Sequence, residues 1–420
     1  MNQQAPHDYS NTLTTFAAIC IGASVPLIFT GRAMIGVALI LALIFIFASP
    51  KRGQFISSLK TALNHPASWF LQGIMIVWIP NLFVSPTPDK SIETIVRTGF
   101  VVLVAGFIYA TLHHDRALHN KAIKALIITS FIFALIAVTA LIFLPELYHL
   151  THGNGWKPSY VQKSYKPAAA AGALMIPALF WVATSHTGKW KILSYSSCGL
   201  FLAAIFMTAN KAAFAGLLAA FALFVLLTVF HRHNRTRVIL TIAVFLASIL
   251  AVFYWLYVTR GSMPYPDYDW PAPPWLIDWH RQSIWSFAWD QGSNNRWFGT
   301  GINAIDKLEG SKSLSPFLTS TTNIPFHPHN WAVEVVIETG FIGFFSLLAF
   351  IGYATLRMIK LYFKTSSTAI MGALCVWAVY WGSGLFNFSF WSVWWQASFL
   401  ILSALCLSGH SHSKNNSITS

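Results

Sequence analysis

Charged residues are scarce in this sequence. Only 10% of its 420 residues are Asp, Glu, Lys or Arg, whereas soluble domains usually contain about 25%. Acidic residues are especially few, 13 against 27 Lys and Arg, and the net charge of +14 is scattered between apolar runs without a contiguous basic stripe. The composition therefore excludes a soluble enzyme and argues against a nucleic-acid-binding protein.

Cysteine is also rare. Four cysteines lie inside apolar stretches, with no Cys-x-x-Cys pair and no His partner at metal-ligand spacing; they are Cys20, Cys198, Cys375 and Cys406. We therefore expect no disulfide, no structural metal and no cofactor. Residues 1–11 lack the basic segment of a cleaved signal peptide, so the first apolar run is expected to remain as a helix.

Long apolar runs dominate the remaining sequence. A bilayer core needs about 20 apolar residues per helix and leaves no backbone polar group unsatisfied, so each run predicts a spanning helix. We expect an all-α polytopic membrane protein with about twelve transmembrane helices. The expected spans are 13–30, 33–49, 67–84, 92–112, 122–144, 167–185, 191–209, 211–230, 238–258, 330–358, 367–387 and 390–408. A tight turn at Asn210 and Lys211 separates the seventh and eighth.

Lys and Arg in the short loops predict the orientation, because cytoplasmic loops are enriched in these residues. Fifteen fall on the side of the amino terminus and six on the other, so both termini are expected in the cytoplasm. The chain then divides into membrane helices one to nine (1–258), a periplasmic loop (259–329), helices ten to twelve (330–408) and a disordered cytoplasmic tail (409–420). No soluble second domain is predicted.

The loop at 259–329 is rich in aromatic residues, with six of the eighteen tryptophans at 270, 275, 279, 285, 289 and 297. A disordered linker would be poor in aromatics, so this loop is predicted to fold as a cap against the membrane interface. Within it, 278–291 reads as a short amphipathic helix with Trp285 and Trp289 one turn apart.

A polar turn with two histidines precedes the tenth helix, in the segment Pro325-Phe-His-Pro-His-Asn-Trp-Ala-Val-Glu-Val-Val-Ile-Glu-Thr-Gly340. Asn330 is a plausible helix cap, and Asn330, Glu334 and Glu338 line one helix face. A carboxylate inside the bilayer costs at least about 2.5 kcal/mol, so Glu338 either has a function or pairs with a cation to fix helix packing. His327 and His329 could accept a proton from a hydroxyl nucleophile.

Cations are expected at the same outer face: Arg97, Lys211, Arg281 and Arg296. Arg binds phosphate oxygens with two donors and Lys provides a point charge, so the set could hold a diphosphate. Lipid head-group contacts and ordinary salt bridges are the alternative.

Two further motifs carry less weight. Asp267-Tyr-Asp269 is like the acidic pair that binds a metal in many nucleotide-sugar transferases, but it lies in a proline-rich stretch on the wrong side of the membrane, so no metal is predicted. Phe298-Gly-Thr-Gly301 lacks the preceding strand and following Lys of a phosphate-binding loop, and we expect a tight turn.

Four motifs taken together resemble the O-antigen ligase family, which includes related polysaccharide polymerases. They are Arg281-Gln-Ser-Ile-Trp285, Trp297-Phe-Gly-Thr-Gly301, His327-Pro-His-Asn330 and Glu338-Thr-Gly340, a close match over roughly 281–345, and Trp391-Ser-Val-Trp-Trp395 is similar to some members. The resemblance implies a GT-C-like membrane fold. It also implies inverting, metal-independent transfer of a glycan from undecaprenyl diphosphate to a lipid A-core sugar hydroxyl, at the periplasmic face of the bacterial inner membrane.

The resemblance also implies residue roles. His329 would orient or deprotonate the acceptor, and Arg281 would bind the diphosphate. Lys211 stands where many members have an arginine, so the charge is kept but the two-donor fork is lost. Lys163 and Lys166 are further diphosphate candidates.

Two other functions are weighed against the ligase. A polymerase of the same superfamily would use the same lipid-linked donor and extend another lipid-linked glycan. A lipid flippase or solute transporter would also suit twelve helices, but it predicts inverted repeats and broken mid-membrane helices, and the sequence suggests neither.

Overall fold

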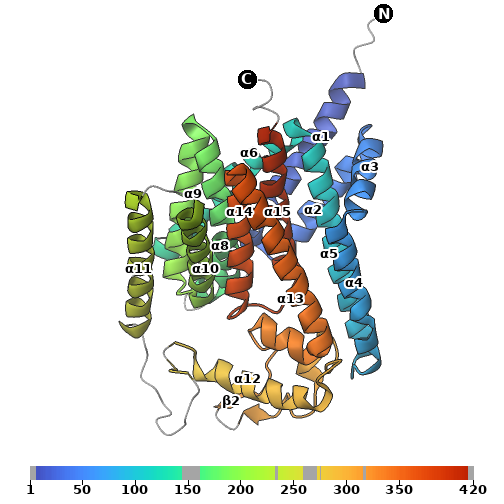
Figure 1. Ribbon diagram of the computed structural model, residues 1–420, viewed down its shortest axis with the longest axis vertical. Coiled ribbons are helices and arrows are strands. Elements are labelled where there is room, and N and C mark those ends of the chain that lie inside the picture. Colours follow the sequence, from blue (N-terminus) through green and yellow to red (C-terminus); the bar gives the residue numbers. More distant parts are fainter. Residues whose placement is uncertain are drawn as a thin grey trace, which may run out of the picture.

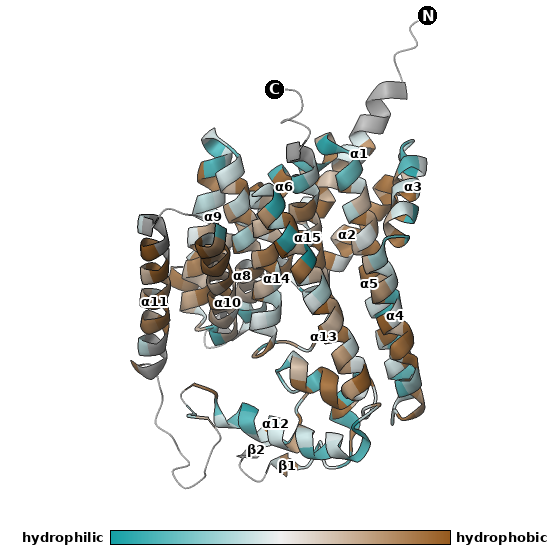
Figure 2. Ribbon diagram, viewed as in Figure 1, coloured by the Kyte–Doolittle hydropathy of each residue, from teal (hydrophilic) through white to brown (hydrophobic). Residues whose placement is uncertain are grey.

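The computed structural model describes residues 6–143, 161–231, 235–258, 272–274, 276–315 and 318–414, and it is about 81% helical. Most helices run alongside one another in a bundle (Figure 1). The first turn of α1 and the last turn of α15 lie at one end of this bundle, and α12 crosses the opposite end. Figure 2 shows that the bundle helices are largely apolar, whereas α12 has a mixed surface.

Fourteen α-helices and four 3-10 helices are described. The α-helices are α1 (Pro6–Ala23), α2 (Met34–Ala48), α3 (Arg52–Leu63), α4 (Pro66–Val77), α5 (Pro88–His114), α6 (Arg116–Ile142), α8 (Val161–Ser185), α9 (Gly188–Met207), α10 (Lys211–His231), α11 (Arg235–Val258), α12 (Trp279–Gly292), α13 (Trp331–Thr365), α14 (Thr368–Gly384) and α15 (Val393–Lys414). The 3-10 helices are η1 (Pro26–Thr30), η2 (Ile79–Phe83), η4 (Ser293–Asn295) and η5 (Ile305–Lys307). The strands β1 (Leu314–Ser315) and β2 (Leu318–Thr322) form an antiparallel hairpin.

The predicted all-α polytopic membrane protein is confirmed. Each of the twelve predicted spans overlaps at least one helix, and within the described residues six helices are long and apolar enough to cross a bilayer, or seven if the bent pair α2 and α3 forms one span. The number of crossings stays a prediction. Helix α3 was not predicted, because its sequence carries too few apolar residues to look like a span.

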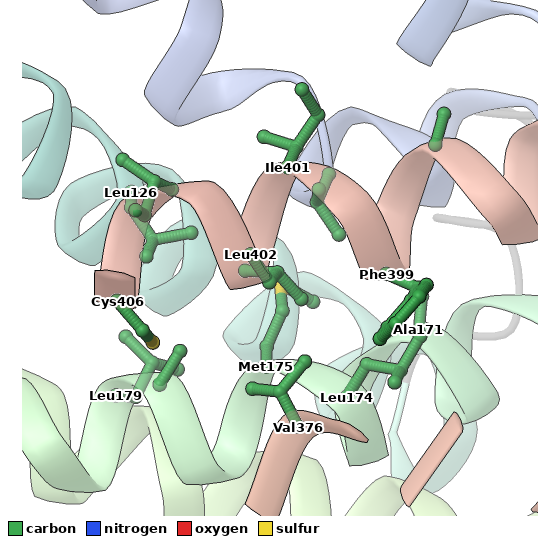
Figure 3. Close-up of a cluster of buried hydrophobic side chains, with 14 of the residues drawn as sticks. Leu126, Ala171, Leu174, Met175, Leu179, Val376, Phe399, Ile401, Leu402 and Cys406 are labelled. Atoms are coloured by element: carbon green, nitrogen blue, oxygen red, sulfur yellow. The ribbon is translucent and has the colours of Figure 1, made fainter. Parts of the chain in front are cut away.

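The core of the bundle is built from small residues packed between larger aliphatic ones. Helix α8 buries a run of alanines, Ala168–Ala171, which lets neighbouring backbones approach closely. Figure 3 shows side chains of this core from four helices that are distant in the sequence: Leu126 on α6, Leu174 on α8, Val376 on α14 and Leu402 on α15. This packing fixes the ends of α10, α14 and α15, from which the site described below is built.

Two smaller apolar clusters join the loop region to the bundle. Ile284 and Ala288 of α12 pack with Ile337 of α13, and Trp78 packs with Phe390 and Trp391 before α15. The helix predicted at 278–291 is confirmed as α12, which begins one residue after its Asp278 cap. Its predicted amphipathic character is not, because the buried residues include the polar Gln282 and Ser283. Residues 259–271, which include Asp267 and Asp269, lie outside the described residues.

Two expectations require correction. Helix α13 was expected to be continuous, but it is broken at Gly340, whose φ of 68° and ψ of −179° are not helical. The sequence pattern could not reveal the break because both halves are apolar. Helix α15 continues to Lys414, so helical structure extends beyond the expected boundary at 408 and into the segment predicted to be disordered.

Candidate active site

The two histidines before α13 are held against each other. His329 has a positive φ of 56°, and its backbone N–H donates to His327 Nδ1 at 3.1 Å. The centres of the two imidazole rings are 4.1 Å apart. Trp285 of α12 donates from its indole N–H to the carbonyl of Pro328 at 2.7 Å, so the turn between the histidines is attached to α12.

Arg281 lies in the first turn of α12. Asp278 caps this helix by accepting from the Arg281 backbone N–H at 2.9 Å, and its other carboxylate oxygen pairs with the Arg281 guanidinium. The guanidinium also donates to the carbonyl of Phe386 at 3.2 Å. Its Nε is buried and has no hydrogen-bond partner among the described residues, so one donor of this side chain is not committed.

The loop between α14 and α15 brings these two groups together. His329 Nδ1 lies 3.1 Å from the carbonyl oxygen of Asn387, the residue after Phe386. A carbonyl oxygen can only accept, so Nδ1 of His329 carries the proton and Nε2 of the neutral ring is the acceptor. His327 has the opposite tautomer, because its Nδ1 accepts from a backbone N–H.

The environment of the two imidazoles is cationic. Burial and then the neighbouring cationic groups lower the pKa of His329 from 6.5 to about 4 and that of His327 from 6.5 to about 3; Arg281 contributes to both shifts. Both rings are therefore neutral near pH 7, and Nε2 of His329 keeps its lone pair. The exposed Lys211, at the start of α10, interacts electrostatically with Asp278 and Arg281.

The tight α9–α10 turn positions Lys211. Ala209 adopts a positive φ of 47°, and the Asn210 side chain accepts from Ala213 N at 3.1 Å while donating to the backbone carbonyl of Lys166 at 2.9 Å. The predicted tight turn is confirmed. The backbone of Lys166 therefore adjoins this turn; Lys163 lies one turn earlier in α8, and its side chain is outside the described residues.

Glu334 and Glu338 are buried and hold the loops in place. Glu334 accepts from the Ser389 hydroxyl and the Phe390 backbone N–H, both at 2.6 Å. Glu338 accepts from the backbone N–H groups of Asn303 at 2.7 Å and Ile305 at 3.1 Å, and from the Trp391 indole. The partners of Glu338 are therefore neutral donors, and not the cation that was one of the two expectations for this residue.

The Trp297–Gly301 motif docks onto the break in α13. Gly301 N donates to the Glu338 carbonyl at 3.1 Å, and Phe341 N donates to the Arg296 carbonyl at 2.8 Å. The break at Gly340 therefore exchanges its helical hydrogen bonds for bonds to this turn. Asn330 caps the first half of α13 as predicted, accepting from Ala332 N at 3.0 Å and Val333 N at 3.2 Å.

Arg97 and Arg296 lie apart from this arrangement. Arg97 pairs with Glu93 on the same helix at 2.8 Å. The exposed Arg296 lines a small hollow of about 140 Å³ with Trp289 and Phe341, which includes neither histidine. Among the described residues, no hydrogen bond or ion pair joins either arginine to His329 or Arg281.

The sequence around this site is similar to a known protein family. Residues 196–348 match the O-antigen ligase family model. The match runs from α9 to the second half of α13 and includes Lys211, Arg281, His327, His329 and Glu338. It confirms the resemblance to the O-antigen ligase family, of ligase or polymerase type. No curated protein matches the chain.

Some residues at this candidate active site were not predicted. Arg32 was not among the predicted site residues, yet it interacts electrostatically with His327. His280 precedes Arg281, and its Nε2 is buried without a hydrogen-bond partner among the described residues. The carbonyls of Phe386 and Asn387 carry no sequence signal, because any residue has a backbone carbonyl.

Proposed function

We propose that this protein is an O-antigen ligase that transfers a glycan from undecaprenyl diphosphate to a sugar hydroxyl of the lipid A core. The observation that supports it most is the attachment of Arg281 and His329 to successive carbonyls, those of Phe386 and Asn387. A guanidinium and a neutral imidazole held by neighbouring carbonyls support the proposal, because glycosyl transfer from a diphosphate needs a cation and a base close together.

Arg281 and Lys211 bind the diphosphate of the donor. Their charges oppose the negative charge that grows on the leaving group as the bond between the anomeric carbon and the phosphate oxygen breaks. Asp278 offsets only one of the two cations, so the pair retains an excess of positive charge. One charge-assisted hydrogen bond from the uncommitted Arg281 Nε would add to this binding.

His329 acts on the acceptor. Its Nε2 accepts the proton of the sugar hydroxyl while the hydroxyl oxygen bonds to the anomeric carbon from the face opposite the diphosphate, which inverts the configuration there. A bound diphosphate partly neutralises Arg281, and so restores basicity to the imidazole. The base is therefore strongest when the donor is in place. The transfer is expected to need no metal or cofactor.

The surroundings of the site agree with a reaction between two lipids. The site lies at the end of the bundle opposite the start of α1 and the end of α15 (Figure 1). With both termini in the cytoplasm of a bacterial cell, the site faces the periplasm at the surface of the inner membrane. Exposed Trp289 and Trp297 at this end suit the membrane interface.

Reconstitution with two acceptors tests the proposal. Purified protein is mixed with undecaprenyl-diphosphate-linked glycan and either lipid A-core or a second portion of lipid-linked glycan, with and without a chelator. A ligase attaches glycan to lipid A-core in both conditions. If only the lipid-linked glycan is extended, the protein is a polymerase. If neither acceptor is consumed, both enzymatic functions are contradicted and a transport function remains.

A further inference from the structure

Arg32 lies in the short loop between η1 and α2, and its position is fixed by aromatic rings. Its guanidinium carbon is 5.7 Å from the centre of the Phe388 ring and 5.5 Å from that of the Trp394 ring. Phe388 belongs to the segment that joins α14 to α15, and Trp394 lies in the first turn of α15. A guanidinium held over ring faces keeps its N–H donors free to bind in its own plane.

Phe388 links Arg32 to the candidate active site. Three successive residues of this loop each contact a different cationic or imidazole group: Phe386 accepts from Arg281, Asn387 accepts from His329, and Phe388 packs under Arg32. Because adjacent residues are only 3.8 Å apart along the chain, this segment brings the three groups to one place.

Within the described parts of the chain, no carboxylate pairs with Arg32. The described residues form six ion pairs, and none includes Arg32. Two other arginines considered for this site, Arg97 and Arg281, each pair with a carboxylate, whereas Arg32 pairs with none of those described. The Arg32 side chain is exposed, and a ligand can reach it.

We infer that Arg32 binds one phosphate of the lipid-linked diphosphate while Arg281 and Lys211 bind the other. The inference rests on the proposed function and assigns a specificity to this arginine. Arg32 makes the site selective for a diphosphate over a monophosphate, because only a diphosphate can contact Arg32 and the pair Arg281 and Lys211 at the same time. The carrier leaves the reaction as undecaprenyl diphosphate, which keeps both phosphates and should compete with the donor, whereas the monophosphate should bind poorly.

Binding measurements with two isoprenoid probes test this inference. The affinity of the purified full-length protein in detergent is measured for undecaprenyl diphosphate and for undecaprenyl monophosphate, in wild type, Arg32→Ala and Arg281→Ala. Wild type should prefer the diphosphate. Arg32→Ala should lose about tenfold in diphosphate affinity, the effect of one charge-assisted contact, with monophosphate affinity within about twofold of wild type. Arg281→Ala should weaken both.

An equal loss of affinity for both probes in Arg32→Ala, or no loss for either, overturns the inference. Equal loss is the result expected if Arg32 only supports Phe388 and Trp394. Monophosphate binding at the wild-type level shows that the variant is folded. If Arg32→Ala cannot be purified, the same two affinities are measured for Arg32→Gln, which keeps a planar group over the rings. Wild-type protein that binds neither probe contradicts the proposed function itself.

Discussion

His329 and Arg281 each donate a hydrogen bond to one of two consecutive backbone carbonyls, Asn387 at 3.1 Å and Phe386 at 3.2 Å. The two side chains come from segments 48 residues apart and are positioned by a third segment near the end of the chain. Since Glu334 and Glu338 bind the next residues of that segment, the loop from Phe386 to Trp391 connects the site to α13.

The pH dependence of transfer should reflect the lowered pKa of His329. Burial and the positive charge of Arg281 hold this pKa at about 4, so the imidazole stays unprotonated well below its ordinary value of 6.5. The kcat/KM for the donor should therefore stay level from about pH 8 to about pH 5 and fall below that, since it reports the free enzyme.

Arg281→Gln removes one cause of the lowered pKa of His329. The residual kcat/KM of this variant should therefore begin to fall at a higher pH than in wild type, closer to 6.5. With saturating donor, the kcat of wild type should also show its acid limb at a higher pH than kcat/KM does, because the diphosphate neutralises Arg281. Profiles recorded in overlapping buffers check both shifts. An acid limb at 6.5 in wild type that Arg281→Gln leaves in place would show that the imidazole is not in this cationic environment.

Gly340→Ala should destabilise the protein and reduce transfer. The backbone at Gly340 lies in a region that other residues avoid, and a Cβ there would meet the Trp297 carbonyl oxygen at 2.2 Å. Gly352→Ala is the matched control on the same helix, because a Cβ there meets nothing within 4 Å. It should leave the protein unchanged or stabilise it by up to about 1 kcal/mol. Thermal unfolding in detergent compares them, and similar melting temperatures would mean that the break is not constrained.

Glu338→Gln should lower the free energy of unfolding. Glu338 accepts from two backbone N–H groups and the Trp391 indole, and the amide of Gln would turn a donor toward at least one of them. An unsatisfied buried donor costs about 1–3 kcal/mol. Glu93→Gln, at an exposed carboxylate paired with Arg97, should cost less than about 1 kcal/mol. Equal thermal stability of the two variants would show that Glu338 is not a structural anchor.

Lys211→Met should raise the KM for the lipid-linked donor about tenfold or more, because a cation opposite the diphosphate is lost. Lys211→Arg should retain donor binding, since it keeps the charge and adds the two-donor geometry suited to phosphate. Initial rates at varied donor and saturating acceptor distinguish them. Wild-type kinetics in Lys211→Met would remove this residue from the diphosphate site.

Most of the helices could be predicted from the sequence, because a membrane-spanning helix requires a long run of apolar residues. Apolar runs located the helices, and the cap Asn330 and the helix after Asp278 followed from local preferences. The break at Gly340 could not be found in this way, because it is stabilised by the distant turn at Trp297–Gly301.

The candidate site was predictable only in part for the same reason. His327, His329 and Arg281 have side chains suited to the chemistry, so they could be chosen from the sequence. The backbone carbonyls that align them have no such signature, and the relevance of Arg32 depends on Phe388, 356 residues away. Glu338 illustrates the converse, since its charge suggested a function or a cation partner while the fold provides N–H donors.

One measurement tests the central claim most directly: transfer of glycan to lipid A-core, assayed with donor binding in parallel, for wild type, His329→Ala, Arg281→Ala and His114→Ala. His114 lies at the far end of α5 and serves as the control. The account predicts that His329→Ala binds donor but transfers at least about a hundredfold more slowly, that Arg281→Ala loses donor affinity, and that His114→Ala behaves as wild type. Wild-type transfer rates in both His329→Ala and Arg281→Ala would contradict it.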